Sequence, residues 1–217
     1  MGSTESKPAG RRIRGLDAAE RREQRRALLL DAALELFAEN GFHNTSIEQI
    51  CQTAYVGTKS FYEVFDSREA CYIELLHRVS DRIGATMAAV LEDAPADDSK
   101  AGGVLVTAFA HALVDDPRLA RVTFGEAPGI SRAVERQRRS NRRWAAGFLV
   151  SVWERYGALP KRRGVDYHRV AVGAIGGMFD LVSDWLLDAD PGKPSDVEEL
   201  IKDLTAFYEV VRAGVRR

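Results

Sequence analysis

The segment at residues 44–70 constrains the fold of this 217-residue chain more than any other stretch. Thr45 stands three positions before Glu48, which is the capping-box pattern of a helix start. Apolar residues then recur at helical spacing as far as Ala54, and residues 55–57 interrupt the pattern. We therefore expect a short helix that ends in a tight turn.

A second short helix is expected at residues 58–65, where Phe61 and Phe65 lie four positions apart. Asp66 and Glu69 repeat the cap pattern before a much longer helix. Two short helices joined by a tight turn form the helix-turn-helix, which places its second helix in the major groove of DNA. The segment therefore predicts a DNA-binding unit.

The same residues resemble the DNA-binding end of the TetR family of bacterial transcriptional repressors. That family shows G-[FY]-x-x-[TS]-[TS] after its first helix, where residues 41–46 spell GFHNTS. It then shows I-A-x-x-A-G-V-S-x-G-T-[LF]-Y-x-[HY]-F-x-[SN]-K-[ED]-x-L, where residues 50–71 spell ICQTAYVGTKSFYEVFDSREAC. The close match covers roughly residues 25 to 75. Four positions depart from the pattern: Tyr55, Gly57, Lys59 and Arg68.

The resemblance implies a set of DNA contacts around the second short helix. The start of that helix would present Thr58, Lys59 and Ser60 to base edges, with Lys59 donating to guanine. Thr45, Tyr62 and Arg68 match family positions that grip the phosphate backbone. The expected DNA-binding residues are Thr45, Gly57, Thr58, Lys59, Ser60, Tyr62 and Arg68.

Each of these contacts has a structural alternative. Thr45 could serve only as a cap, and Tyr62 could cover the core. Arg68 could form an ion pair with Glu69 or Glu63. A tyrosine at the family's turn glycine, Tyr55, implies backbone strain of about 1–2 kcal/mol or a different turn. Its side chain could also reach the DNA backbone.

Charge is distributed unevenly near this unit. Residues 1–30 carry eight basic and four acidic side chains, whereas residues 31–70 carry two basic and seven acidic ones. Residues 1–20 are polar and are expected to form a disordered basic arm. The arm could hold phosphates or enter a minor groove, or it could be a solvated leader. The acidic surroundings favour a role of the arm in DNA binding.

The whole chain is expected to be all-α. Residues 21–66 would form the helix-turn-helix domain, and residues 67–217 a larger helical domain for effector binding and dimerisation. Helices are expected at residues 17–40, 67–92, 101–115, 130–156, 165–188 and 196–213, with another short one starting at Asp116-Pro117. The sequence shows no internal repeat and no convincing strand.

The last two helices are expected to form a homodimer. Small residues cluster in the penultimate helix, and an apolar stripe runs along the final helix. An isologous pairing of this helix pair would make a four-helix bundle, and a palindromic DNA site needs two copies. The resemblance implies the same dimer. The alternative is that both stripes pack within one subunit.

The resemblance also implies a small-molecule effector, largely apolar, among the middle helices. The candidate ligand-binding residues are Met87, Phe109, Phe124, Trp144, Phe148 and Met178. At helical spacing each of them could equally be a core residue. His77, His111 and Glu126 could supply polar groups. The run of arginines at residues 132–143 could indicate an anionic ligand, but a solvated face is the favoured interpretation.

Other classes of function have little support in the sequence. The four histidines are scattered, and neither a phosphate-binding glycine loop nor a Gly-x-Ser-x-Gly motif occurs. Cys51 and Cys71 form no disulfide or zinc pattern. Because none of these motifs is present, we expect no metal, no cofactor and no enzymatic activity. The longest uncharged runs fall short of the roughly 20 residues of a membrane span.

The sequence therefore predicts a cytoplasmic, ligand-responsive regulator that represses transcription from a palindromic operator as a dimer. The alternative is an all-helical scaffold or small-molecule-binding protein with a degenerate DNA-binding head.

Overall fold

The computed structural model describes residues 18–125, 129–157, 159–160 and 164–216, and this part of the chain is helical without strands. The all-α prediction is confirmed. The expected basic arm lies almost wholly outside the described residues. The helices are α1 (Ala18–Asn40), α2 (Ile47–Thr53), α3 (Thr58–Tyr62), α4 (Arg68–Glu92), α5 (Asp98–Val114), α6 (Pro117–Phe124), α7 (Arg132–Arg155), α8 (Tyr167–Asp188) and α9 (Pro194–Arg216).

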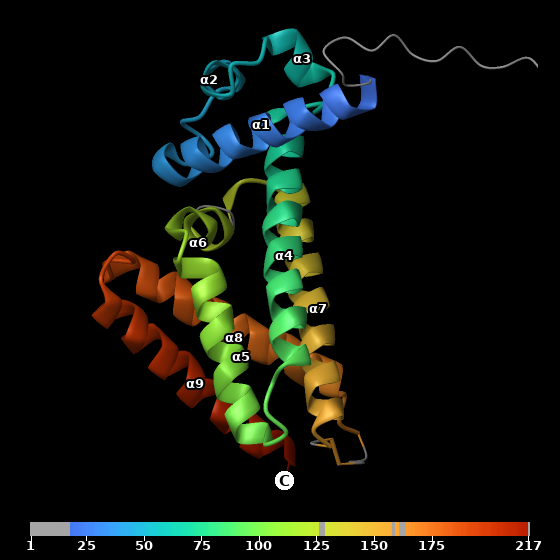
Figure 1. Cartoon of the computed structure of the whole chain (residues 1–217), viewed down its shortest axis with the longest axis vertical. Coiled ribbons are helices and arrows are strands. Elements are labelled where there is room, and N and C mark those ends of the chain that lie inside the picture. The colour runs from blue at the N-terminus through green and yellow to red at the C-terminus, as the bar shows by residue number, and fades with distance from the viewer. Residues whose placement is uncertain (1–17, 126–128, 158, 161–163, 217) are drawn as a thin grey trace, which may run out of the picture.

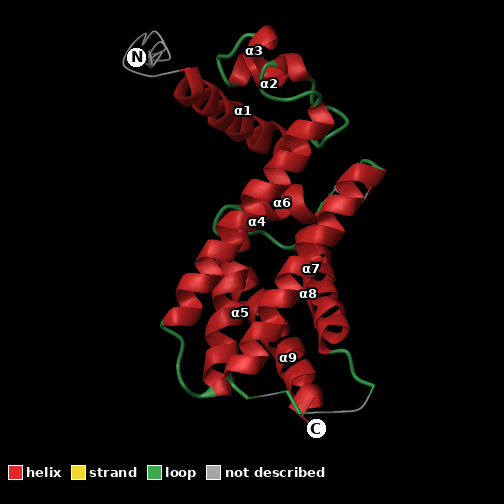
Figure 2. Ribbon diagram, turned by 90° about the vertical axis from the view of Figure 1, so that its right-hand side faces the viewer, coloured by secondary structure: helices red, strands yellow, loops and turns green. Residues whose placement is uncertain are grey.

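The helices form two parts, which we call the head (α1 to α3) and the body (α5 to α9). Figure 1 shows the head gathered at one end, with α4 running from it into the body beside α7. The view from the side in Figure 2 shows the same order, with α6 lying between the head and the rest of the body.

The start of α2 lies one residue later than the sequence pattern predicted. Ser46 is the N-cap: its hydroxyl accepts from the Gln49 backbone N–H at 3.1 Å, and the Gln49 side chain accepts from the Ser46 N–H at 2.7 Å. The capping box predicted from Thr45 and Glu48 is wrong. The Thr45 hydroxyl instead points inward, where it hydrogen-bonds the Gly41 carbonyl at 2.8 Å.

The second helix of the motif is also shorter than expected. α3 ends at Tyr62, and the chain turns through residues 63–66 before α4. The N-cap of α4 is Ser67, whose hydroxyl accepts from the Ala70 N–H at 3.0 Å, so the predicted Asp66 cap is wrong. The extended backbone of Ser67 brings its side chain to the free N–H groups of the first turn.

Two clusters of buried side chains hold these parts together. The head core joins α1 to α3 with α4 as far as Val79, and it also takes Leu119 and Val122 from α6. The body core joins α5 to α9 and takes Ala120 and Phe124 from α6. The domain boundary expected between residues 66 and 67 therefore falls inside a continuous core.

The apolar stripes of the last two helices are divided between the interior and the surface. Leu200 and Leu204 of α9 are buried within the subunit. Val170 and Leu187 of α8 and Val210 of α9 remain exposed. Packing within one subunit thus uses part of the stripe and leaves another part uncovered.

Among the described helices, α8 is long and apolar enough to cross a membrane, with a mean hydropathy of 1.5. It packs against α7 and α9 and carries Asp180 and Asp184 along its length. A core helix of a soluble protein has the same composition, so this is weak evidence for a membrane span.

Candidate nucleic-acid interface and ligand cavity

The start of α3 is an exposed surface on a buried support. Phe61 is fully buried in the head core and its ring contacts that of Phe65. Thr58 and Lys59 are exposed, Ser60 is half-buried, and the Tyr62 side chain is exposed. The helix therefore holds three polar side chains and a phenol on its outer face, where a duplex could reach them.

The turn before α3 contains a strained tyrosine. Tyr55 has φ of 53° and is the non-glycine residue with positive φ among those described. Its side chain is 98% exposed. The left-handed turn implied by the family glycine is thus kept despite the substitution. Gly57, by contrast, has ordinary extended backbone, and an added Cβ there would meet no atom.

Thr45 does not present its side chain to the surface. The residue is fully buried, and its hydroxyl donates to the last turn of α1, at the carbonyls of Leu36 and Gly41. In this structure the Thr45 side chain is thus turned away from the surface, and its expected phosphate contact stays a prediction. Its role is to fasten the start of α2 to the end of α1.

Arg68 is held within the head. Its guanidinium donates to the Thr45 carbonyl and lies 4.3 Å from the centre of the Phe42 ring. The alternative ion pair with Glu69 or Glu63 is not formed among the described residues. Arg68 thus ties the start of α4 to the start of α2, and its remaining N–H groups are the ones left for a phosphate.

Several acidic groups near the head are paired with arginines. Arg25 of α1 lies 3.4 Å from Glu63, and Arg78 of α4 donates to Asp31 at 2.6 Å. Arg26 also pairs with Glu74 across α1 and α4. The pairs with Glu63 and Asp31 neutralise part of the acidic excess of residues 31–70. However, Arg25 and Arg26, which the sequence offered as possible DNA contacts, are engaged in ion pairs.

The two cysteines are buried, free thiols in the head core. Burial raises the pKa of Cys71 to about 12, and burial also raises the pKa of Cys51. Both therefore stay protonated at neutral pH and are poor nucleophiles and metal ligands. Within the described residues no group of histidine, cysteine and carboxylate side chains is placed to hold a metal ion.

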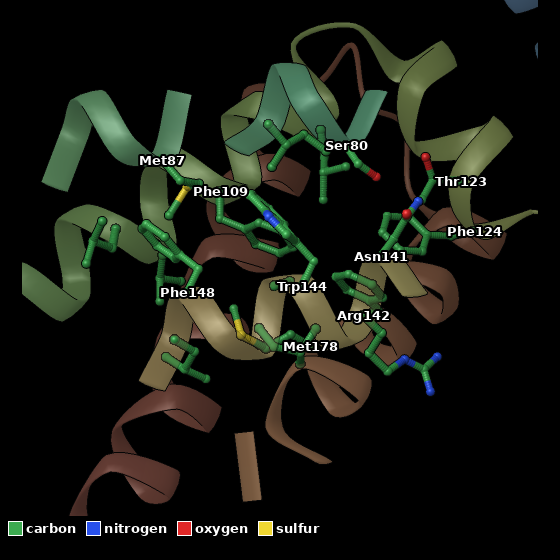
Figure 3. Close-up of a pocket in the computed structure, with 18 of the residues that line it drawn as sticks. Ser80, Met87, Phe109, Thr123, Phe124, Asn141, Arg142, Trp144, Phe148 and Met178 are labelled. Atoms are coloured by element: carbon green, nitrogen blue, oxygen red, sulfur yellow. The ribbon is translucent and has the colours of Figure 1, made fainter. Parts of the chain in front are cut away.

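The body contains a cavity of about 110 Å³ between α4, α5, α6, α7, α8 and α9. The structure brings all six candidate ligand residues to its wall: Met87, Phe109, Phe124, Trp144, Phe148 and Met178. They come from α4, α5, α6, α7 and α8, and Figure 3 shows them converging on the cavity. His77 and His111 lie away from it, and His111 is exposed beside Asp115. Glu126 lies outside the described residues.

The polar groups of the wall were not among the sequence candidates. Ser80, Thr123 and Asn141 line the cavity, as do Arg138, Arg142 and Tyr208. Both arginines belong to the run at residues 132–143 that the sequence favoured as a solvated face. Their spacing of four places them with Ala145 and Leu149 on the inner side of α7, which is the one signal that could have identified them.

The cavity and the head core share three helices, α4, α6 and α7, the last with Val134 in the head core and Asn141 in the cavity wall. Leu76 of α4 belongs to the head core and also lines the cavity. On α6, Thr123 and Phe124 line the cavity, and Val122 lies in the head core. The buried Tyr72 hydroxyl of α4 donates to the Val122 carbonyl at 2.6 Å. A displacement of these helices at the cavity wall would therefore also move residues that pack in the head core.

Comparison with known proteins gives a family match at the head and a fold match over the whole chain. The family model described as bacterial regulatory proteins, tetR family, matches residues 29–75. The transcriptional regulator RutR of Escherichia coli K12 is 36% identical over 87 residues, which cover 40% of this chain and 38% of RutR. The aligned part thus spans well under half of that relative.

Two solved structures with the same fold are the fatty acid degradation regulator FadR from Bacillus halodurans and FadR from Bacillus subtilis in complex with stearoyl-CoA. The first is 20% identical, covers 89% of this chain and 97% of its own, and has a TM-score of 0.70. The second is 21% identical, covers 87% and 98%, and has a TM-score of 0.66. At such identities the likeness shows the fold alone.

Proposed function

The chain belongs to the TetR family of bacterial transcriptional regulators, and on this premise we propose that it is a ligand-responsive DNA-binding regulator, acting as a repressor. It binds a palindromic operator as a homodimer in the cytoplasm, and a small molecule in the body cavity releases it. The observation that carries this proposal is that α4 and α6 belong both to the cavity wall and to the head core.

DNA recognition is assigned to the exposed face of α3. Lys59 donates to guanine O6 or N7, and the Thr58 and Ser60 hydroxyls meet bases or phosphate. Tyr62 grips the phosphate backbone, and Arg68 adds to that contact through the N–H groups that Thr45 leaves free. Gly57 lets the DNA approach closely, because it is exposed and nothing surrounds the position of its Cβ.

Dimerisation is assigned to the uncovered parts of α8 and α9. Val170, Leu187 and Val210 are exposed there, and Gly173 has no atom within reach of an added Cβ. A second copy would bury these apolar groups, and two heads would then match the two halves of a palindrome.

Effector binding is assigned to the cavity. Its wall is mostly apolar with a few polar groups, which is the usual character of small-molecule sites. The FadR relative in complex with stearoyl-CoA supports the idea that this fold holds a ligand. An effector that favours one arrangement of α4 and α6 would shift the spacing of the two heads.

The test is selection of bound duplexes from a random pool, repeated with Lys59→Ala and with Lys100→Ala as a control on the exposed start of α5. We expect an enriched palindrome, steep loss of affinity with salt, and altered base preference only in Lys59→Ala. Unchanged preference in that variant would contradict base recognition by Lys59.

The alternative function is a helical ligand-binding or scaffold protein with a degenerate head. The positive-φ Tyr55 and the acidic excess around the head favour it. The same selection separates the two, because a degenerate head would enrich no sequence even at low salt.

A further inference from the structure

The cavity wall has an apolar side and a polar side. Figure 3 shows Met87 and Phe148 together on one side and Thr123, Asn141 and Arg142 on the other. The Phe179 ring, which also lines the cavity, contacts that of Phe124 at 4.9 Å and stacks on that of Phe109 at 6.2 Å between ring centroids. A ligand that fits this wall has an apolar body and its polar group at one end.

The polar side of the wall carries two arginines, and only one of them has a carboxylate partner among the described residues. Arg138 pairs with Glu135 at 2.9 Å. Arg142 forms no ion pair with any described residue, and its Nε is buried without a hydrogen-bond partner. In the part of the chain that the structure describes, the wall contains no aspartate, glutamate or histidine. Among the described residues, the half-buried Arg142 is therefore left without a carboxylate partner beside an apolar cavity, where it could pair with an anion.

The other polar groups of the wall add no charge. Asn141 already bonds Gln137 at 2.7 Å and the Leu76 carbonyl at 3.4 Å. The Thr123 hydroxyl is buried without a partner on the same side as Arg142. The Tyr208 hydroxyl remains neutral, because burial raises its pKa to about 12.

The position of Arg142 also indicates how such a ligand lies. Its guanidinium is 5.9 Å from the centre of the Phe179 ring, and in Figure 3 it extends away from the apolar side. It stands beside Gly176 of α8, where an added Cβ would lie 3.7 Å from Nη1. The charged end of the ligand would therefore lie at the margin of the cavity, and its apolar end would point toward Met87.

Building on the proposed function, which makes this cavity the effector site, we propose that the effector is an amphipathic anion. Its apolar body lies against Phe109, Phe148 and Phe179, and an anionic group at its other end pairs with Arg142. In a free carboxylic acid this group is the carboxylate. In an acyl thioester of a phosphorylated carrier it is a phosphate, because the thioester itself is uncharged.

Calorimetric titration with octanoate, 1-octanol and acetate tests the proposal. The alcohol has the same chain without the charge, and acetate has the charge without the chain. We expect octanoate to bind at least about tenfold more tightly than either. Equal binding of 1-octanol and octanoate would overturn the anionic assignment, and equal binding of acetate would overturn the apolar one.

Variants at α7 assign the charge to one residue. Arg142→Gln should weaken octanoate at least about tenfold and leave 1-octanol within about twofold, while Arg142→Lys should restore part of the loss. Arg143→Gln is the matched control, because Arg143 is exposed and lies outside the cavity wall. The same loss in both glutamine variants would contradict a specific role of Arg142.

Octanoyl-coenzyme A distinguishes the two sources of the end group. Tighter binding than octanoate, with the same dependence on Arg142, would favour acyl thioesters, and weaker binding would favour free acids. If neither anion binds, the inference is wrong. The proposed function would then still stand on the selection of DNA, which needs no effector.

Discussion

At the scale of single residues, Tyr55 is the position where the fold is most strained. An L-residue with φ near 53° is disfavoured by about 1–2 kcal/mol, and the exposed ring returns few contacts. Tyr55→Gly should therefore raise the free energy of unfolding, by about 0.5–1 kcal/mol after the larger entropy loss of glycine. Chemical denaturation measures this change.

The control for this prediction is Tyr55→Ala, which removes the ring but keeps the strain and should change stability little. A lower denaturation midpoint for Tyr55→Gly would mean that the tyrosine makes contacts worth more than the strain. A strained and exposed aromatic residue in the turn of a DNA-binding motif is also a candidate DNA contact.

The sequence pattern can identify the N-cap of a helix only where neighbouring residues do not both fit the capping pattern. Thr45–Glu48 and Ser46–Gln49 both satisfy the capping pattern, and the spacing alone cannot choose between them. Ser46 is the cap because Thr45 fits against the end of α1 and hydrogen-bonds there. That contact joins residues nine positions apart, so a local pattern does not contain it.

At the scale of helices, the glycines of α8 serve different neighbours. An added Cβ at Gly177 would lie 2.6 Å from the Phe207 ring of α9, whereas at Gly173 it would meet nothing. Gly177→Ala should therefore destabilise the subunit by about 1–3 kcal/mol, because the half-buried ring must move. Gly173→Ala should not, because alanine is the better helix former. Thermal unfolding of the two variants compares them.

A loss of stability in Gly173→Ala would point to a partner helix on that face. Measuring the oligomeric state by ultracentrifugation decides the matter, because a contact between copies would also make the loss depend on protein concentration. Equal effects of the two variants in a monomeric protein would contradict the assigned packing.

At the helix scale, the aromatic residues predicted for ligand binding line the cavity, while their contact with a ligand stays a prediction. Phe109, Phe124 and Phe148 could be identified because large apolar residues on a helix mostly face the interior or a ligand. Arg142 was missed because a run of arginines is typical of a solvated face. Only the packing of α7 in the folded chain places two of them, Arg138 and Arg142, at the cavity wall.

At the scale of the whole molecule, the head and the body are joined by shared helices more than by a linker. α6 supplies Leu119 and Val122 to the head core and Ala120 and Phe124 to the body core. The sequence predicted two domains divided at residue 66, because a turn and a new cap stand there. The head core crosses that turn, so a local turn signal does not by itself mark a boundary, and the division stays a prediction.

The bond from the Tyr72 hydroxyl to the Val122 carbonyl is the buried polar link in this shared region. Tyr72→Phe should destabilise the head by about 1–2 kcal/mol, because it leaves a buried carbonyl with one partner fewer. All three tryptophans, Trp144, Trp153 and Trp185, lie in the body, so their fluorescence reports its unfolding. Circular dichroism reports the helices of both parts.

The two signals should coincide in the unmodified protein, since its parts unfold together, and separate in Tyr72→Phe, with the dichroism changing first. Tyr156→Phe is the matched control, because the Tyr156 hydroxyl, just after α7, donates at 2.9 Å to the carbonyl of Pro95 in the loop between α4 and α5. This bond lies away from the head. The variant should shift both signals together. Coincident signals in Tyr72→Phe would mean that apolar contacts alone couple the head to the cavity.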